Sequence, residues 1–456
     1  MTRLFAACLV AFAVPSVAAA QAQPRPVRPY RGLFGGAPPS DINRLRHELT
    51  FTGSGLGGFD DYITLPSSSS GPVQPGVSRQ HGFTGAGDAR LAYWVGRQVR
   101  WFSAEARTFA NAYSVIDVDP TVGAESHLQF QSQMGRRNRI DLTQSLNYQP
   151  TLVLGAFAPL GVDVDPALLP DDGRSSGLVE QRSWTATGAA TLERRWSARH
   201  STTAAYNYGQ LTYVDGVGFD NRTHTANLLH TWNLSRAWSL RPVYRFSDMS
   251  LDDSNASGTP ITNHNGEVGL AYTHHMSATR QVAVSWGGGT THVTTVHPVT
   301  RVPLAYWTPS GYASFDTDIG RSWSLSMNYR RAANVLPGVT VQAFATDALA
   351  LQAEGFASRR LQLVFSAGLS NGRAEGGTGS GRFDSYNGTA RMRFALSQCC
   401  AALVSYDYYK YSLRDLPDVP TSVPPEYDRN AVRFGMTFWL PLYGARSTPG
   451  EPTGGR

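Results

Sequence analysis

The stretches SRAWSLRPVYR (Ser235–Arg245) and GRSWSLSMNYR (Gly320–Arg330) are closely similar and form a repeated phrase of the sequence. Each begins with a short polar turn and continues into a run in which apolar and polar residues alternate. In the second copy the apolar members are Trp323, Leu325, Met327 and Tyr329. Alternation with a period of two residues is typical of a β-strand with one apolar face. The repeated phrase therefore predicts a turn that leads into a strand.

Similar polar turns recur along the whole chain at a nearly constant spacing of about 40 residues, apart from one interval of about 60. They are VGRQVRW (95–101), MGRRNRI (134–140), LERRWSA (192–198), LSRAWSL (234–240), MSATRQV (276–282), IGRSWSL (319–325), FASRRLQ (356–362) and LSQCCAA (396–402). A fixed period of this size indicates a repeated supersecondary unit. Alternating runs fill the intervals, so the predicted unit is a pair of strands rather than a pair of helices.

Eight such turns join sixteen strands, and one further strand is expected at each end, over about 43–52 and 429–443. The hairpins are separated by longer segments rich in Gly, Pro, Ser and Asp: 53–87, 111–124, 151–181, 251–263, 293–303, 372–384 and 414–428. Short turns at one end, long loops at the other and an even strand number are typical of outer-membrane barrels. We predict an all-β transmembrane antiparallel β-barrel of about 18 strands (16–18), with short periplasmic turns and longer extracellular loops.

A soluble β-propeller or β-sandwich is the competing interpretation, because it also produces alternating strands. The difference in length between the two sets of connections favours the membrane barrel. So do the many hydroxyl, amide and Arg residues on one face, and aromatic residues at strand ends. Trp238 and Trp323 are expected at the inner membrane interface, as members of an aromatic belt. Closure also removes the unpaired strand edges that lipid cannot satisfy.

The chain is expected to divide into four segments. Residues 1–22 carry a small positive start and an apolar run that ends in small residues, as in a signal peptide. Residues 23–42 form a Pro-rich periplasmic lead, 43–444 the outer-membrane barrel, and 445–456 a flexible C-terminal tail. The lead is too short for the plug domain of an energy-coupled transporter. This organisation predicts that the protein is located in the outer membrane of a Gram-negative bacterium.

Charge and cysteine content narrow the possible partners. Only 16% of the residues are charged, the formal net charge is +6, and Lys410 is the only lysine. No basic helix or zinc-ligand spacing occurs, so no nucleic-acid partner is expected. Apart from Cys8 in the leader, the cysteines are the adjacent pair Cys399 and Cys400. Adjacent cysteines rarely bridge because the ring is strained, so no disulfide framework is expected.

The closing segment RNAVRFGMTFWLPLYG (429–444) resembles the last strand of a family of uncharacterised β-barrel porins of Gram-negative bacteria. Some members of that family are associated with exopolysaccharide export. The resemblance implies insertion by the barrel-assembly machinery, with Phe434, Phe438, Trp439 and Tyr443 as the assembly signal. The chain departs from the usual pattern because the tail ARSTPGEPTGGR follows the strand.

A barrel of sixteen to eighteen strands encloses an aqueous lumen. The residues predicted to line it are Arg44, Arg46, Arg90, Arg107, Arg241, Arg245, Arg330, Arg391, Arg393 and Arg433. Opposite charges are expected on the same face at Glu48, Glu105, Asp141, Glu193, Glu267, Glu354 and Asp407. Because pore selectivity follows the charge on the wall, the arginines favour passage of small anionic solutes or an acidic polysaccharide. The alternative is that the mixed charges only neutralise one another.

Two loops are candidates for narrowing the pore or shaping its rim. Segment 152–177 is unusually apolar for an exposed loop and is expected either to constrict the lumen or to pack on the rim. Segment 53–85 is expected to be a flexible surface loop, because it is rich in Gly and Ser.

An outer-membrane hydrolase with a His-based site at the outer rim is one alternative function. The candidates are His224 and His230 near Asp220, and the pair His292 and His297. A nucleophile needs a base within hydrogen-bond reach, and no local pattern supplies one.

The G-x-S-x-G match GRSSG, centred on Ser175, lacks the strand and helix that a nucleophile elbow requires. We therefore assign no catalytic residue, no metal site and no cofactor, and predict a chain that is not an enzyme. A structural or adhesive surface barrel without transport is a further alternative.

Overall fold

The computed structural model describes residues 45–63, 80–97, 99–114, 120–152, 179–214, 220–253, 256–277, 280–296, 302–320, 322–335, 343–375, 381–397, 399–415 and 425–444. Every regular element in these ranges is a β-strand. Within the same ranges, no helix has the length and apolar character needed to span a bilayer. The predicted signal peptide, periplasmic lead and C-terminal tail lie outside the described residues, as does most of the apolar segment 152–177.

Eighteen strands of 13 to 22 residues follow one another along the chain. They are β1 (Arg46–Ile63), β2 (Gln80–Arg97), β3 (Arg100–Tyr113), β4 (Thr121–Met134), β5 (Asn138–Leu152), β6 (Val179–Arg195), β7 (His200–Tyr213), β8 (Asp220–Asn233), β9 (Trp238–Asp253), β10 (Ala256–Ser277), β11 (Arg280–Val296), β12 (Pro303–Ile319), β13 (Trp323–Val335), β14 (Ala343–Phe356), β15 (Leu361–Ala374), β16 (Arg382–Ala395), β17 (Cys400–Arg414) and β18 (Glu426–Tyr443). The predicted strand number is confirmed.

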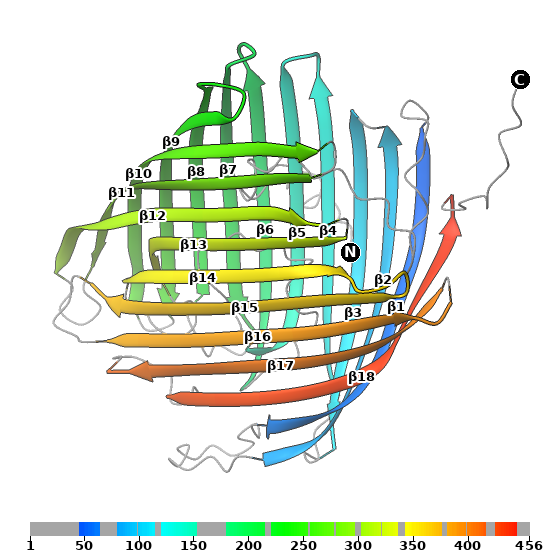
Figure 1. Ribbon diagram of the computed structural model, residues 1–456. Helices are drawn as coiled ribbons and strands as arrows, with labels where there is room; N and C mark the ends of the chain where they lie inside the picture. Colours follow the sequence, from blue (N-terminus) through cyan, green and yellow to red (C-terminus); the bar gives the residue numbers. More distant parts are fainter. Residues whose placement is uncertain are drawn as a thin grey trace, which may run out of the picture.

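Each strand pairs antiparallel with the next, and β18 pairs with β1 to close the barrel (Figure 1). In Figure 1 the red β18 runs beside the blue β1, although the two strands are at opposite ends of the chain. The closing ladder runs from Leu49 opposite Tyr443 to Asp60 opposite Ala431. Closure leaves no strand edge unpaired, which is what a sheet in lipid requires.

All eight turns predicted from the sequence coincide with the short connections of the barrel, such as 98–99 between β2 and β3 and 396–399 between β16 and β17. In the turn between β8 and β9, the backbone N–H groups of Leu234 and Ser235 both donate to the carbonyl of Trp238, at 2.9 and 3.1 Å. The Ser235 hydroxyl accepts from the N–H of Trp238 at 3.0 Å. The repeated phrase is therefore a hairpin turn with the foot of the following strand.

Two of the predicted loops are shorter in the structure than the sequence suggests. Segment 53–87 was expected to be a loop, but β1 continues to Ile63 and β2 begins at Gln80. Segment 251–263 was also expected to be a loop, but only residues 254–255 separate β9 from β10. Gly, Ser and Asp lower intrinsic strand propensity, yet here pairing on both sides supplies the backbone hydrogen bonds. Phe59, for example, pairs with Val432 on one side and Phe83 on the other.

The outward face of the barrel is a belt of exposed apolar side chains. Leu91, Tyr244, Val268 and Val432 are 43%, 48%, 58% and 47% exposed, and each has a charged residue at one of the two neighbouring positions of its strand. Trp238 is the first residue of β9 and belongs to the same outward set. An apolar band around a closed barrel is the surface that a bilayer solvates. The outward surface of the barrel therefore fits a bilayer, as the sequence predicts.

The inward face changes in character along the barrel axis. Towards the strand ends opposite the eight short turns, Leu251, Ile261, Val293 and Ala343 form a buried apolar cluster. Nearer the middle of the barrel the inward positions are polar or charged, and many of them are hydrogen-bonded to one another across strands. This polar zone of the inner wall contains the candidate site.

Candidate functional site

The described arginines among those predicted to line the pore share the inward face of their strands. Strand alternation places each one beside an outward apolar residue: Arg90 beside Leu91, Arg245 beside Tyr244, and Arg330 beside Tyr329. The same register puts Arg107, Arg241, Arg391, Arg393 and Arg433 on this face. Arg44 lies outside the described residues, and Arg46 begins β1 with a side chain that is not described.

The seven acidic residues predicted to oppose the arginines occupy inward positions as well. The alternation therefore places both signs of charge on one wall. Which charges meet depends on the register between strands, and two polar clusters of the wall carry the argument.

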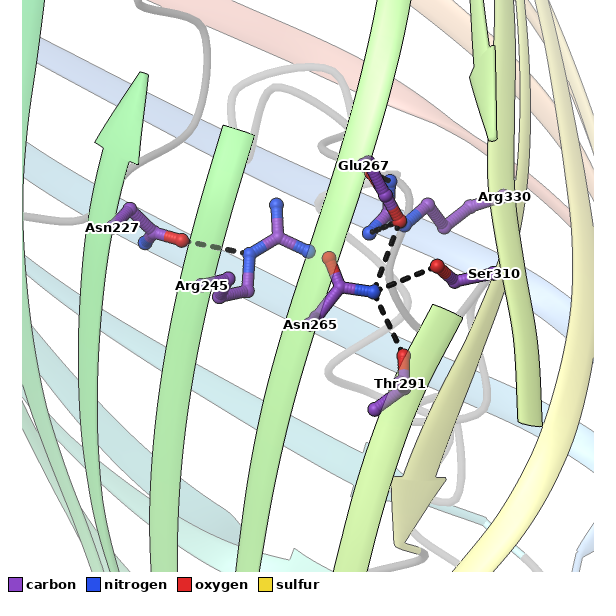
Figure 2. Close-up of polar contacts among 7 residues, drawn as sticks. All are labelled: Asn227, Arg245, Asn265, Glu267, Thr291, Ser310 and Arg330. Atoms are coloured by element: carbon purple, nitrogen blue, oxygen red, sulfur yellow. Dashed lines mark hydrogen bonds and ion pairs between the residues drawn. The ribbon is translucent and has the colours of Figure 1, made fainter. Parts of the chain in front are cut away.

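The first polar cluster, which we call the β8–β13 cluster, centres on Asn265 of β10 (Figure 2). Its amide nitrogen donates to Thr291 Oγ1 and Ser310 Oγ, both at 2.7 Å, and to Glu267 Oε1 at 3.2 Å. Thr291 and Ser310 belong to the next two strands, β11 and β12. One buried amide thus ties three neighbouring strands together in the lumen wall.

Glu267 carries the negative charge of this cluster. Its two carboxylate oxygens each lie 2.8 Å from the guanidinium of Arg330 on β13, in a two-pronged ion pair. The side chains are only 1% and 9% exposed. A buried carboxylate and guanidinium need such mutual pairing, because an isolated charge there would lose its hydration. Arg330 is consequently neutralised by Glu267.

Arg245 and Arg241 of β9 add positive charge to the same cluster. The Nε of Arg245 donates to Asn227 Oδ1 on β8 at 2.8 Å, and its guanidinium extends towards Asn265 (Figure 2). Arg241 lies on the same inward face, opposite Gly269 of β10. The Nε atom of Arg241 is buried without a hydrogen-bond partner. Arg241, Arg245 and Arg330 thus share this wall with Glu267, and Arg330 is the arginine with which Glu267 forms its ion pair.

Tyr312 of β12 fills the wall beside these arginines. Its ring lies over Gly269 and Gly287, where a Cβ on Gly287 would come within 2.6 Å of the Tyr312 ring. The guanidinium carbon of Arg330 lies 5.9 Å from the ring centroid. Gly287 belongs to the triple glycine of β11, which accordingly makes room for an inward side chain. Asp316 and Asp318, further along β12 towards the short turn, are on the same face.

The second cluster, which we call the seam cluster, spans β17, β18, β1, β2 and β3. At the closing seam Arg429 of β18 donates to both carboxylate oxygens of Asp60 on β1, and both side chains are almost fully buried. Nearby, Arg433 lies 3.6 Å from Asp407, and Arg107 lies 3.4 Å from Asp88.

A fourth pair in the seam cluster, Arg90 with Glu105, is more exposed and 2.5 Å apart. Four arginines thus face four carboxylates, and the seam cluster is balanced.

The pair Asp60–Arg429 was not predicted from the sequence. Arg429 stands four residues before Arg433 on the same alternating strand, so the period would have placed it on the inward face. Asp60 was hidden inside the segment assigned to the first loop. A longer first strand is the signal that would have revealed its position.

The histidines proposed for a hydrolase are not assembled into a catalytic group. His224 Nδ1 is hydrogen-bonded to Tyr206 at 2.7 Å, and His230 contacts Thr202 and His200. Asp220 lies at the other end of β8 from His230, and its carboxylate accepts from the N–H of Tyr213.

His292 packs against the outward Trp307 with ring centroids 4.8 Å apart. His297 and Ser175 lie outside the described residues. Within the described ranges, no three His, Cys, Asp or Glu residues are grouped so as to hold a metal ion.

The four residues of the expected assembly signal occupy both faces of β18. Phe434 and Phe438 point outward and are 64% and 40% exposed. Trp439 pairs with Thr52 and shares the inward face. A register shift follows, and Tyr443 pairs with the outward-facing Leu49.

Comparison with known proteins gives a likeness of overall fold. No family model matches the sequence, and no curated protein matches it. Among solved structures, Pseudomonas aeruginosa OpdO is 10% identical with a TM-score of 0.43, over 87% of this chain and 98% of that one. Acinetobacter baumannii OccAB2 is 11% identical with a TM-score of 0.43, over 89% and 100%. Pseudomonas aeruginosa OccK5 (OpdH) is 11% identical with the same TM-score, over 88% and 99%.

Proposed function

We propose that this barrel is an outer-membrane pore for small solutes and that its lumen mildly favours anions over cations. The observation that supports the preference is Arg241 on the inward face of β9, whose Nε atom is buried without a hydrogen-bond partner. Arg241 shares the wall of the β8–β13 cluster with Arg245 and with the ion pair Glu267–Arg330. Asp316 and Asp318 lie on the same face of β12, further towards the short turn. Because the seam cluster is balanced, it contributes little to the sign of the field. Selectivity follows the sign of the charge that lines the pore.

The proposal is tested by the reversal potential of the refolded barrel in a planar bilayer with asymmetric potassium chloride. A steady conductance with a reversal potential displaced towards that of chloride is expected. A displacement towards potassium would contradict the anion preference but leave the pore intact. Absence of conductance from a folded barrel would contradict the pore itself and favour a structural or adhesive barrel.

An acidic polysaccharide is the proposed larger substrate, supported by the resemblance of the last strand to porins associated with exopolysaccharide export. The measurable consequence is blockade of the current by a polyuronate added to one side. A neutral dextran of equal length serves as the control, because it should block less if the arginines attract the carboxylates. Equal blockade by both polymers would exclude charge recognition of the chain.

We further propose that the signal peptide directs the chain to the periplasm and that the barrel-assembly machinery inserts it. The outward Phe434 and Phe438 near the end of β18 support this assembly signal. Replacing both by Ser should lower the amount of folded protein in the outer membrane fraction. Unchanged levels would show that the signal lies elsewhere.

The geometry favours a pore over a hydrolase because the three histidines contact groups other than Asp220. His224 bonds Tyr206, His230 contacts Thr202 and His200, and His292 packs on Trp307. A nucleophile and its base must lie within hydrogen-bond reach of one another. The inward polar wall, by contrast, is continuous over many strands.

A further inference from the structure

The adjacent cysteines of the turn between β16 and β17 form the closest contact between two reactive side chains on the described turns. The Sγ atoms of Cys399 and Cys400 lie 3.0 Å apart, and both residues are partly exposed and unbridged. Ser397 Oγ lies 3.3 Å from Cys399 Sγ and also accepts from the backbone N–H of Cys399 at 3.3 Å. We propose that Cys399 and Cys400 are a reversible redox pair that closes to a vicinal disulfide by thiol–disulfide exchange.

The turn holds the two thiols on one side of the backbone. The N–H groups of Leu396 and Ser397 both donate to the carbonyl of Cys400, at 3.0 and 3.1 Å, so the chain reverses just before the pair. Trp439 of β18 donates its N–H to the carbonyl of Cys399 at 2.8 Å. In a regular strand, neighbouring side chains point to opposite faces. Here the turn geometry brings the sulfurs together instead.

The two thiols differ in their readiness to react. Hydrogen bonds from the Cys400 thiol and then from the Ser397 hydroxyl lower the pKa of the Cys399 thiol. A thiolate is the attacking species in exchange, so Cys399 is the nucleophile and Cys400 the resolving thiol. Two sulfurs are sufficient for this chemistry. A metal site would need more ligands, and within the described residues no third His, Cys, Asp or Glu joins the pair.

Oxidation of the cysteine pair needs a two-electron oxidant, and any accessible disulfide, R–S–S–R, can supply it. The Cys399 thiolate attacks one sulfur, a mixed disulfide forms, and the first R–S⁻ leaves and takes up a proton. Cys400 then loses its proton, and its sulfur attacks Cys399 Sγ and displaces the second R–S⁻, which is protonated in turn. Two protein thiols become one disulfide while one R–S–S–R becomes two R–SH.

The product should be labile rather than structural. Consecutive Cα atoms across a trans peptide are about 3.8 Å apart, whereas disulfides usually join Cα atoms about 4.4–6.8 Å apart. The strain of the small ring makes the bond easier to reduce. Short turns of outer-membrane barrels lie on the periplasmic side, and the bacterial periplasm is oxidising. The proposed membrane orientation decides only the compartment in which the cysteine pair lies. The thiol chemistry does not depend on that orientation.

The test uses the refolded full-length chain carrying Cys8→Ser, which leaves Cys399 and Cys400 as its two thiols. It is equilibrated in a series of buffers with increasing ratios of oxidised to reduced glutathione. After an acid quench, free thiols are alkylated and the intact mass is measured. Both alkylatable thiols should be lost together on the oxidising side, without retained glutathione, and should return on the reducing side. The proposal would be overturned if both thiols persisted throughout the series. It would also be overturned by a stable glutathione adduct on the protein that retains both Cys399 and Cys400.

Matched single variants separate the pair from a single reactive thiol. Cys399→Ser and Cys400→Ser should each retain one glutathione in the same oxidising buffers, because no second thiol displaces it. Ser397→Ala should slow alkylation of Cys399 roughly two- to fivefold, because the thiolate loses a hydrogen bond. An unchanged rate would remove Ser397 from the site. Retention of β-structure and heat-modifiable migration checks that each variant folds.

A labelling experiment in cells distinguishes this inference from the proposed orientation and pore. A maleimide too large to cross the outer membrane should label the pair only after the membrane is permeabilised. Labelling in intact cells would place the turn outside and overturn the periplasmic assignment, while the glutathione result would stand. A non-conducting barrel with a closing dithiol would contradict the pore but not the redox pair.

Discussion

The β8–β13 cluster and the seam cluster are built from the same residue types but have different consequences. In the seam cluster each arginine has a carboxylate, and its central pair Asp60–Arg429 joins the first and last strands of the barrel. In the β8–β13 cluster one buried pair, Glu267–Arg330, is accompanied by Arg241 and Arg245. Paired charges stabilise closure, whereas an arginine of the lumen wall beyond the ion pairs, such as Arg241, acts on solutes. The difference shows that an inward arginine is not by itself evidence of selectivity.

The largest expected effect is on stability at the seam. Asp60→Asn should destabilise the barrel by about 3–5 kcal/mol, because it leaves the charge of Arg429 buried without an opposite charge. Urea unfolding of the refolded barrel, followed by gel mobility, measures the change. The double variant Asp60→Leu/Arg429→Leu is the control and should recover most of the loss. If the single variant unfolds at the wild-type midpoint, the pair does not stabilise closure.

A smaller loss of stability is expected in the β8–β13 wall from Gly287→Ala. The added Cβ would come within 2.6 Å of the Tyr312 ring, and displacing a packed ring should cost about 1–3 kcal/mol. Gly209→Ala on β7 is the matched control, because a Cβ there meets nothing within 4 Å. Equal unfolding midpoints for the two variants would show that Tyr312 is not packed against the glycines in solution.

The arginines of β9 should next affect selectivity. Replacing Arg241 and Arg245 together by Gln should reduce the anion-to-cation permeability ratio roughly 15-fold, since each charge about 10 Å from a permeating ion in water favours an anion and disfavours a cation by ~0.4 kcal/mol. Reversal potentials in asymmetric salt give the ratio. The control Arg90→Gln/Glu105→Gln removes a balanced pair of the seam cluster and should change the ratio little. A larger effect of the control than of the test variant would reverse the assignment of the two clusters.

The smallest effect on selectivity should come from Glu267→Gln. The amide keeps hydrogen-bonding atoms for Arg330 and removes one negative charge, so the anion-to-cation permeability ratio should rise roughly fourfold on the same Coulomb estimate. Because Arg330 then stays buried without an opposite charge, the barrel should also lose stability, as in Asp60→Asn. The same reversal-potential measurement detects the change in selectivity, and heat-modifiable gel migration checks that the variant folds. A fall in anion preference would show that Glu267 does not act on the lumen field.

Most of the architecture was predictable from local pattern. The eight short turns, the eighteen strands and the inward position of the described arginines follow from a period of about 40 residues and from alternation within each run. The predictions of strand length were wrong where the local amino-acid composition disfavours a strand that the fold nevertheless contains. In the first segment, Gly57 and Asp60 are poor strand formers, yet both belong to β1 because β2 and β18 pair with it on either side.

By itself, the sequence determined the class of the barrel, the places where the chain turns and the face on which each side chain stands, because these depend only on residues close together in the chain. Tertiary structure alone decided which charges meet: Glu267 with Arg330 across two intervening strands, and Asp60 with Arg429 across the closure. Register between strands is set by pairing along the whole ladder, and a shift of one residue would send every side chain to the opposite face. The charge that a solute meets in the lumen is therefore a property of the closed barrel.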